Sequence, residues 1–364
     1  MNYYLSFMYP LSLLVGVFVG GYASFLTPGF AFLLLPVFDQ LTGIADAQSG
    51  RRRRNPDTPL IVYCALQPVL IFLVLNHIHH TTPDLIEVTG LLLSLAVCTG
   101  LVGTCAGHEL LHRKGSLRIL AKVQLGSILN LQYVVNHIKN HHYYGGTSMD
   151  HSTPAYKENF YGFLLRSLAG GLRASWAYEK YRMAKRGYAL FGYQNMMMHA
   201  FAAMVILPVS VWLIFDSATL IFFLLHCLGA QILGEMMNYV EHYGLMREKT
   251  PYKRYVNFDK NHAWNGRFAM SNWSLFERPR HSHHHMHPEK PFHRLRTDPK
   301  SPQMPFGYTT MLMLALIPPL WFLVMDPLVQ RISRNLPQDH REKKAGKGNP
   351  QAPADPEKPG RKAE

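Results

Sequence analysis

Residues 85–112 read LIEVTGLLLSLAVCTGLVGTCAGHELLH. The part from 85 to 106 is mostly apolar and contains no lysine or arginine, and about 20 such residues suffice for a helix to cross roughly 30 Å of hydrocarbon. The stretch ends in the pattern H-E-x-x-H, in which His108 and His112 share one helical face and can bind one metal ion, while Glu109 can polarise a bound water. The stretch therefore predicts a membrane-spanning helix that ends in a metal-binding pair. By itself it leaves open whether that pair serves a peptidase or another chemistry.

Five further segments approach the length of a membrane span, so the sequence predicts an all-α integral membrane protein with six transmembrane helices. Besides 85–106, the predicted spans are residues 3–22, 26–43, 60–79, 195–215 and 218–240. Three short connections would pair them into hairpins. They are a Thr-Pro-Gly turn at 27–29, the loop from His77 to Asp84, and the turn Phe215-Asp216-Ser217.

The positive charges indicate how the hairpins are oriented. All 37 lysines and arginines fall within three stretches, Arg51–Arg54, Arg113–Arg186 and Arg247–Lys362, and none falls in a hairpin turn. The positive-inside rule then places the turns outside and the basic stretches, both chain termini and the histidine-rich loops in the cytoplasm, for a protein of the inner (plasma) membrane. Anionic lipid headgroups explain the net charge of +14, and no nucleic-acid partner is expected.

We expect one integral-membrane domain over residues 1–330. Within it, residues 305–328 are apolar but interrupted by Pro318-Pro319, and they are interpreted as an interfacial or re-entrant segment because a seventh span would move the C-terminus outside. Residues 337–364 are rich in proline, glycine, lysine and glutamate and lack large apolar side chains. They are predicted to form a disordered, basic cytoplasmic tail.

Histidines are unusually frequent, with 20 in 364 residues, and nine of them come from four places predicted to lie at cytoplasmic ends of spans. These nine are His108, His112, His137, His141, His142, His242, His281, His284 and His285. Each cluster alone has a plain interpretation, as a surface pair or as a loose metal-binding run. Their convergence on one side of the membrane favours a joint site, and nine neutral nitrogen ligands suit two metal ions with room for an exogenous group. Imidazole binds iron, zinc, copper and nickel, so the count does not choose the metal.

The local spacings predict how the clusters are built. In NHIKNHH, at residues 136–142, spacings of four and five are interpreted as one helical face. Metal-bound imidazoles need their second nitrogen held, and four acids are candidates for that role. They are Glu109, Asp150, Glu235 and Glu241. The small residues Gly100, Gly103 and Gly107 are interpreted first as helix-packing positions and second as room for a substrate.

Five motifs in this order resemble the membrane-bound alkane 1-monooxygenases, and more distantly xylene monooxygenase and the fatty acid desaturases. They are HELLHR, NHIKNHH, NYVEHYGLMRE, NHAWN and RHSHHHMHP, and the resemblance runs from the first span to about Val329. The middle histidine box of desaturases is usually H-x-x-H-H, whereas here it is H-x-x-x-H-H. The ligands of the resembled family fall on the nine histidines named above.

The resemblance implies two irons, dioxygen as co-substrate, and hydroxylation of the terminal methyl of medium-chain alkanes, or a related alkyl substrate, to a primary alcohol. It also implies electrons from rubredoxin, itself reduced by an NAD(P)H-dependent reductase. No Gly-rich cofactor motif occurs in the chain, which fits an external electron supply. Two positions depart from the pattern, since Asn136 stands where glutamate is common and His283 where aspartate is usual.

Three alternatives stay open from the sequence. A fatty acid desaturase or hydroxylase, or a xylene-type monooxygenase, would use the same two-iron chemistry. A membrane zinc metalloprotease would use HELLH but leave seven histidines without a role, and a non-catalytic metal-binding membrane protein needs no reaction at all. The sequence does not specify substrate chain length, alkane versus alkyl-aromatic preference, or oligomeric state.

Overall fold

The computed structural model describes residues 3–44, 56–252 and 254–335. In these residues the secondary structure consists of helices and three isolated β-bridges, which confirms the all-α prediction for this part of the chain. The basic stretch Arg51–Arg54 and the predicted tail at 337–364 lie outside the described residues.

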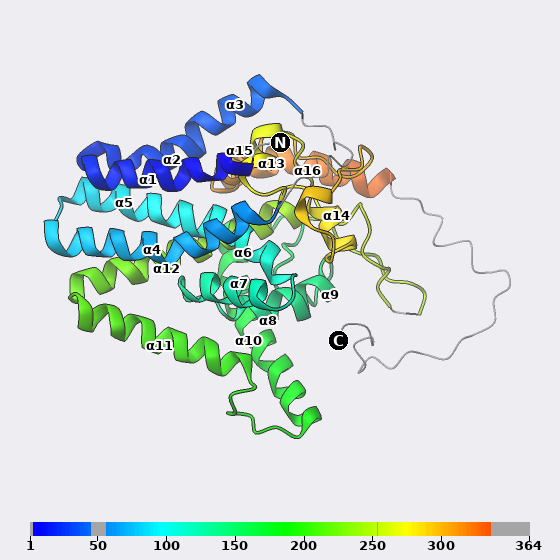
Figure 1. Cartoon of the computed structure of the whole chain (residues 1–364). Helices are drawn as coiled ribbons and strands as arrows, with labels where there is room; N and C mark the ends of the chain where they lie inside the picture. The colour runs from blue at the N-terminus through cyan, green and yellow to red at the C-terminus, as the bar shows by residue number, and fades with distance from the viewer. Residues whose placement is uncertain (1–2, 45–55, 253, 336–364) are drawn as a thin grey trace.

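Within the described residues, five helices are long and apolar enough to cross a membrane, so the protein is a multi-pass membrane protein. They are Gly21–Thr42 (η2 Gly21–Phe25, α2 Leu26–Gly29, η3 Phe30–Leu34, α3 Leu35–Thr42), α4 Thr58–Thr81, Leu85–Leu111 (α5 Leu85–Ala96, η4 Val97–Gly103, α6 Thr104–Leu111), α11 Met196–Ile214 and α12 Ser217–His242. These helices form the layered bundle seen at the left of Figure 1. They correspond to five of the six predicted spans.

The first predicted span, 3–22, is a shorter apolar helix over Tyr3–Val19, made of η1 Tyr3–Phe7 and α1 Met8–Val19. It folds back onto the next helix at Gly20 and Gly21, whose φ angles are +73° and +52°. Such angles favour glycine. The chain thus reverses at Gly20 and Gly21, and the prediction of a turn at residues 27–29 is wrong. Those residues lie inside the next helix, where Pro28 occupies the first turn of α2, a position that tolerates proline.

The other two predicted hairpins correspond to helix pairs joined by short connections. Helix α4 continues through His77 to Thr81, so the loop before α5 is only residues 82–84, and the Asp84 side chain caps α5 by accepting from the Glu87 N–H at 2.8 Å. Between α11 and α12, Asp216 caps α12 in the same way, accepting from the Thr219 N–H at 2.7 Å.

Three glycines in the helix Leu85–Leu111 lie at close contacts. A Cβ at Gly100 would come within 2.4 Å of the Ala230 Cα, and Cβ atoms at Gly103 and Gly107 would meet the side chains of Gln67 and Gln124 within 2.0 and 1.9 Å. The interpretation of these glycines as helix-packing positions is therefore confirmed.

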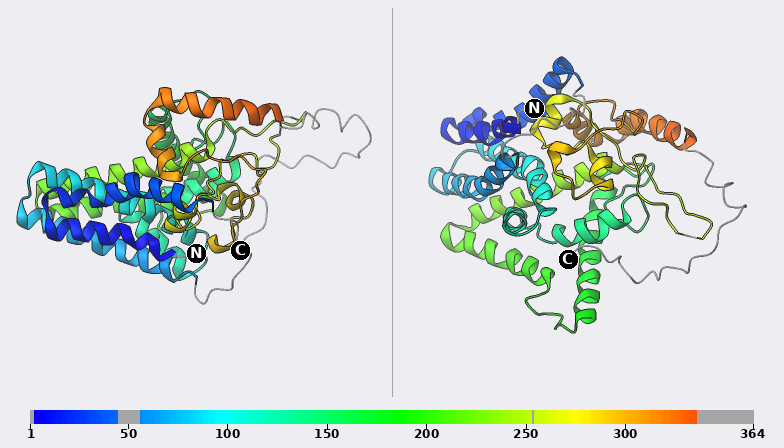
Figure 2. Two further views of the ribbon diagram at one scale, coloured as in Figure 1. Left: turned by 90° about the horizontal axis from the view of Figure 1, so that it is seen from above. Right: turned by 45° about the vertical axis from the view of Figure 1, so that its right-hand side comes forward.

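The remaining elements gather around the end of the bundle at which α6 and α12 end (Figures 1 and 2). They are α7 Ser116–Gly126, α8 Tyr133–Val135, η5 Asn136–His141, α9 His142–Tyr144, α10 Phe160–Arg186, α13 Ala269–Ser274, α14 His281–Met286 and η6 Phe292–Arg294. The apolar segment 305–328 falls in two further helices, α15 Tyr308–Ala315 and α16 Pro318–Asn335, separated just before Pro318. Buried Trp321 of α16 packs on Tyr239 and Tyr243, with ring centroids 5.1 and 5.3 Å apart.

Candidate metal centre

All nine predicted ligands come together at this end of the bundle, from the ends of α6 and α12, from η5 and α9, and from α14 (Figure 1). They form two neighbouring groups. The first histidine group is His108, His112, His137, His142 and His284, and the second histidine group is His141, His242, His281 and His285. Within each group, the potential ligand atoms all lie within 4.8 Å of one another. Each group thus has the arrangement of a metal site.

The nitrogen atoms in each group face one another at short range. In the first group the Nε2 of His137 lies 3.1 Å from that of His112 and 2.9 Å from that of His142. In the second group the Nε2 of His281 lies 2.9 Å from that of His242 and 3.0 Å from that of His285. One N–H cannot satisfy three converging nitrogens, whereas a central metal ion can. With bonds of about 2.1 Å, ligands at right angles lie about 3.0 Å apart and tetrahedral ligands about 3.4 Å apart. The nitrogens in each group are therefore as close together as ligands of one metal ion.

Burial keeps six of these imidazoles neutral, which is the form that binds a metal. Desolvation and nearby positive groups lower the pKa of His112 to about 3. The same causes hold the pKa of His142, His281 and His284 well below the usual range, and burial with neighbouring histidines does so for His137 and His285.

The segment that carries His137, His141 and His142 is a π-helix over Asn136–His141, followed directly by α9. In an α-helix, residues five apart point about 140° away from each other. In the wider π turn, with its i→i+5 hydrogen bonds, they come close together. His137 and His142 therefore join the first group, while His141 turns into the second. The rings of His141 and His142 lie 5.4 and 4.5 Å from the ring of His137, so the three histidines share one side of the segment, and a π turn in place of an α-helical turn brings them there.

Asp150 is the acid that orients a ligand of the second group. Its Oδ2 atom lies 2.8 Å from His141 Nδ1 and also accepts from the Thr153 hydroxyl at 2.6 Å. Burial would raise the pKa of Asp150, but the interaction with His141 and these hydrogen bonds hold it below its usual value. The ionised carboxylate fixes the proton on Nδ1 of His141, so that Nε2 is left for a metal.

Glu241 also contacts the second group. Its Oε2 atom lies 3.3 Å from His281 Nε2, and its two oxygens accept from Arg278 at 2.8 and 2.7 Å and from the Tyr308 hydroxyl at 2.8 Å. No sequence pattern indicated Arg278, because a buried arginine in a loop has no characteristic spacing. Tyr133 was missed for the same reason, although its ring stacks on His137 at 4.9 Å.

Among the described residues, the other two candidate acids have no hydrogen bond or ion pair with a member of either histidine group. Glu109 accepts from Arg113 at 2.8 Å and from the Phe292 N–H at 3.0 Å. Glu235 accepts from Ser167 at 2.6 Å and from Asn238 at 3.3 Å. In the described structure Glu109 is thus a buried, paired carboxylate and Glu235 a partly buried, hydrogen-bonded one.

Positions that depart from the family pattern lie outside both groups. Asn136 donates to the Ser152 hydroxyl at 3.3 Å, and His283 accepts from the Arg296 N–H at 3.4 Å. In α14 it is His281, His284 and His285 that point into the groups. Of the histidines at 281–285, the three predicted ligands are thus the ones that lie in the groups, and their role as ligands stays a prediction.

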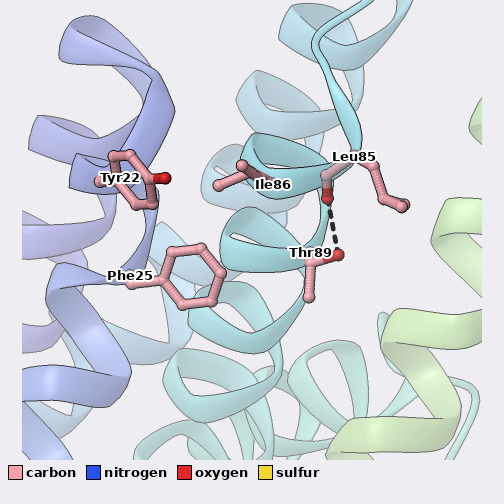
Figure 3. Close-up of a pocket in the computed structure, with 5 residues that line it drawn as sticks. All are labelled: Tyr22, Phe25, Leu85, Ile86 and Thr89. Atoms are coloured by element: carbon pink, nitrogen blue, oxygen red, sulfur yellow. Dashed lines mark hydrogen bonds between the residues drawn. The ribbon is translucent and has the colours of Figure 1, made fainter.

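An apolar groove lies far from the histidine groups, between η2 and the start of α5 (Figure 3). Tyr22, Phe25, Leu85, Ile86 and Thr89 line it, and the Thr89 hydroxyl donates to the Leu85 carbonyl at 2.7 Å. His108 lies near the other end of the same helix, Leu85–Leu111, about 35 Å away at ~1.5 Å per residue. This groove is therefore not part of the metal centre.

Comparison with known proteins shows which family the chain belongs to. The fatty acid desaturase family model matches residues 85–315. Alkane 1-monooxygenase 1 of Pseudomonas aeruginosa is 37% identical over 66% of this chain and 63% of its own length, slightly less than two thirds of that relative. Alkane 1-monooxygenase 2 of the same organism is 31% identical over 82% of both chains, and the xylene/toluene monooxygenase hydroxylase component of Pseudomonas putida is 28% identical over 89% of this chain and 87% of its own. The chain belongs to the fatty acid desaturase family and, within it, groups with the alkane 1-monooxygenases.

Proposed function

We propose that this protein is a non-haem di-iron monooxygenase that hydroxylates the terminal methyl of a medium-chain alkane, or a related alkyl substrate, to a primary alcohol. The observation that carries the proposal is the pair of buried histidine groups at the end of an apolar helical bundle, in a chain that groups with alkane 1-monooxygenases. Each group would hold one iron. Imidazole nitrogen is a suitable ligand for iron, and the spacing of the nitrogens leaves room for further ligands.

Bound iron would supply the chemistry of dioxygen activation, and the chain's own residues supply the surroundings. Asp150 keeps the Nδ1 proton on His141, and Glu241 keeps its carboxylate beside His281 with the help of Arg278 and Tyr308. Burial of the histidines excludes bulk water from a strong oxidant, and the adjoining bundle offers an apolar environment for a hydrocarbon chain that enters from the bilayer.

The zinc-peptidase alternative is disfavoured by the position of Glu109. A peptidase needs this glutamate as the general base beside the metal-bound water. Here it is paired with Arg113 and the Phe292 N–H, and its histidine pair belongs to a group of five. A non-catalytic metal-binding protein is disfavoured by the grouping with monooxygenases.

We propose a topology of six spans, in which Tyr3–Val19 is the shortest, within one domain over residues 1–330. The three hairpin turns would face outward from the inner membrane, and both termini and the metal centre would face the cytoplasm. The lack of lysine and arginine in the turns supports this orientation. The α15–α16 unit would lie at the membrane interface, since α16 ends in the polar sequence QRISRN.

Electrons would come from rubredoxin, reduced in turn by an NAD(P)H-dependent reductase. An alkane monooxygenase needs an electron donor, and the strongly basic chain favours an acidic one. A xylene-type monooxygenase or a fatty acid desaturase or hydroxylase is the second candidate, because the chain also matches the desaturase family model and the xylene/toluene component.

The deciding experiment combines metal analysis with product identification. The purified protein should contain about two iron atoms per chain, one for each histidine group. Reconstituted with rubredoxin, its reductase and NADH, it should convert alkanes of about six to sixteen carbons to 1-alkanols. A single zinc with proteolytic activity would contradict the proposal, and a double bond introduced into an acyl chain would favour the desaturase alternative.

Two histidines of α12 provide a matched test. His242 belongs to the second group, whereas buried His226 lies in the same helix and contacts the Thr99 hydroxyl at 2.9 Å, outside both groups. His242→Ala should lower the iron content by about half and abolish hydroxylation. His226→Ala should keep the iron content of the folded protein. Full iron content and activity in His242→Ala would remove that residue from the site.

A further inference from the structure

Arg247 stands near the end of the motif NYVEHYGLMRE, residues 238–248. It follows His242 of the second histidine group by five residues, just beyond the end of α12. Its side chain is partly buried, and its Nε atom donates to the Val256 carbonyl at 2.6 Å. This contact fixes the direction of the guanidinium close to the end of α12.

The rest of Arg247 binds the end of α9. Its Nη1 atom donates to the Tyr143 carbonyl at 3.0 Å and to the Gly145 carbonyl at 3.3 Å, and its main-chain N–H donates to the Gly146 carbonyl at 2.6 Å. The last carbonyls of a helix lack partners within the helix, and a basic side chain can satisfy them. Arg247 therefore joins the segment Tyr143–Gly146 to the chain that leaves α12.

The segment Tyr143–Gly146 contacts two further histidines of the second group. The Gly145 N–H donates to the His141 carbonyl at 2.7 Å. A Cβ atom at Gly145 would lie 2.8 Å from that carbonyl oxygen and 3.4 Å from Cε1 of His285. Gly145 is buried, so its backbone fills the space between these two histidines. Three of the four histidines in the second group thus lie next to the segment or on the chain that Arg247 joins to it.

We propose that Arg247 is a positioning residue for the second metal site, because it holds the segment Tyr143–Gly146 where the second histidine group can converge on one ion. The inference rests on the proposed metal centre. Metal sites require that surrounding contacts hold their ligands in place. Of the five members of the first group, only His142 is directly bonded to this segment, so the other four ligands keep their own supports. Loss of the Arg247 contacts should therefore weaken metal binding at the second group and spare the first.

Iron binding to the detergent-purified full chain tests this role. Ferrous iron is added without oxygen in the presence of a competing chelator, and the affinity of each of the two sites is measured. Arg247→Lys keeps the charge but lacks the planar fork that reaches the carbonyls of two segments. We expect this variant to hold one iron with unchanged affinity and the second at least ~10-fold more weakly.

Arg182→Lys is the matched control. Arg182 is also partly buried, and it joins Glu179 of α10 to the Gln194 carbonyl in the loop before α11. No hydrogen bond of Arg182 reaches the segment Tyr143–Gly146 within the part of the chain that the structure describes. Both iron affinities of this variant should stay within about twofold of the unaltered protein.

Double variants identify the site that is weakened. His242→Ala removes a ligand of the second group, and His112→Ala removes one of the first. Arg247→Lys combined with His242→Ala should bind iron as His242→Ala alone does, because both changes act on the same site. Arg247→Lys combined with His112→Ala should weaken both sites, because the two changes act on different ones.

The outcomes are distinct. Arg247→Lys with both iron affinities within about twofold of the original overturns the positioning role, and so does equal weakening of both sites. Fewer than two irons in the unaltered protein overturns the proposed metal centre instead. If Arg247→Lys is not recovered folded, Gly145→Ala decides, because its methyl presses on the His141 carbonyl and the His285 ring from the same segment. Selective weakening of the second site in that variant supports the role, and any other pattern refutes it.

Discussion

At the scale of single residues, the chemistry of the centre depends on which nitrogen of each imidazole is free. Asp150 determines this for His141 through a buried contact of 2.8 Å. Such carboxylate partners raise the basicity of a ligand and fix its ring orientation. The carboxylate of Glu241 is placed differently, because it lies 3.3 Å from Nε2 of His281, the nitrogen that faces the other histidines of the second group.

Asp150→Asn should weaken metal binding by the second histidine group by about 10–100-fold, because the charge on the partner of His141 is lost while its shape is kept. Iron retained against increasing chelator concentration measures the effect. Asp298→Asn is the control, since Asp298 forms a more exposed pair with Lys260 at 2.7 Å and should leave iron retention unchanged. Equal retention in both variants would show that Asp150 is not needed for binding.

The nine histidines were predictable because each lies within a short motif at the end of an apolar run. Arg278 and Tyr133 were not, since nothing in the neighbouring residues indicates that a loop arginine and a lone tyrosine approach the same histidines. Their positions depend on how α8, α13 and α14 pack in three dimensions. A single sequence does not encode that packing in any local pattern.

At the scale of elements, the contact between the helix Leu85–Leu111 and α12 depends on small residues. At Gly100 the helix lies against the backbone of Ala230 in α12. Room for a side chain at this position would require the two helices to move apart. Since His108 and His242 lie farther along these two helices, their crossing helps to set the distance between the two histidine groups.

Gly100→Ala should destabilise the protein by about 1–3 kcal/mol, because the added methyl overlaps the Ala230 backbone. The melting temperature of the detergent-purified protein measures this change. Gly234→Ala in α12 is the matched control, since a Cβ there meets no atom within 4 Å, and it should be neutral or stabilising by up to ~1 kcal/mol. A melting temperature unaffected by Gly100→Ala would argue against the close crossing.

Helix positions were largely predictable from apolar length, whereas turn chemistry was misleading in one place. Thr-Pro-Gly at 27–29 has the composition of a turn, yet the chain reverses at Gly20 and Gly21. Both sites carry turn-forming residues, and only the packing of α1 against the following helix selects between them. The composition of 27–29 also suits the first turn of a helix, which is what forms.

At the scale of the whole molecule, the hairpin turns lie at one end of the bundle and the histidine groups at the other (Figure 1). The distribution of lysine and arginine follows this division and was readable from the sequence alone. The same charges placed the four histidine-bearing segments on one side of the membrane, and from this their convergence was inferred. The division of the nine histidines into groups of five and four could not be predicted from the sequence, because it depends on the directions of the side chains.

Cysteine labelling of the intact membrane tests the proposed orientation. Thr82 is exposed in the α4–α5 turn and Glu289 is exposed beyond α14, while the four native cysteines are buried. In right-side-out vesicles an impermeant maleimide should label Thr82→Cys, and it should label Glu289→Cys only after permeabilisation. The reverse pattern would place the metal centre outside the cell and exclude a cytoplasmic electron donor.

The positive charge of the chain predicts a salt-dependent reaction with its electron donor. At limiting rubredoxin, raising the ionic strength from about 0.05 to 0.5 M should slow turnover by roughly tenfold, because attraction between a basic surface and an acidic partner is screened. The KM for the alkane should change little, since binding of a hydrocarbon involves no charge. A turnover rate that does not respond to salt would exclude electrostatic docking.

The π turn at Asn136–His141 also affects how this chain is compared with its relatives. The extra residue between the first and second histidines of H-x-x-x-H-H is accommodated inside the helix, as a local widening, and the flanking loops need not change length. An alignment with a desaturase that has H-x-x-H-H should therefore open its gap between His137 and His141. A gap placed in a neighbouring loop would shift one of these histidines out of register and pair it with a non-equivalent residue.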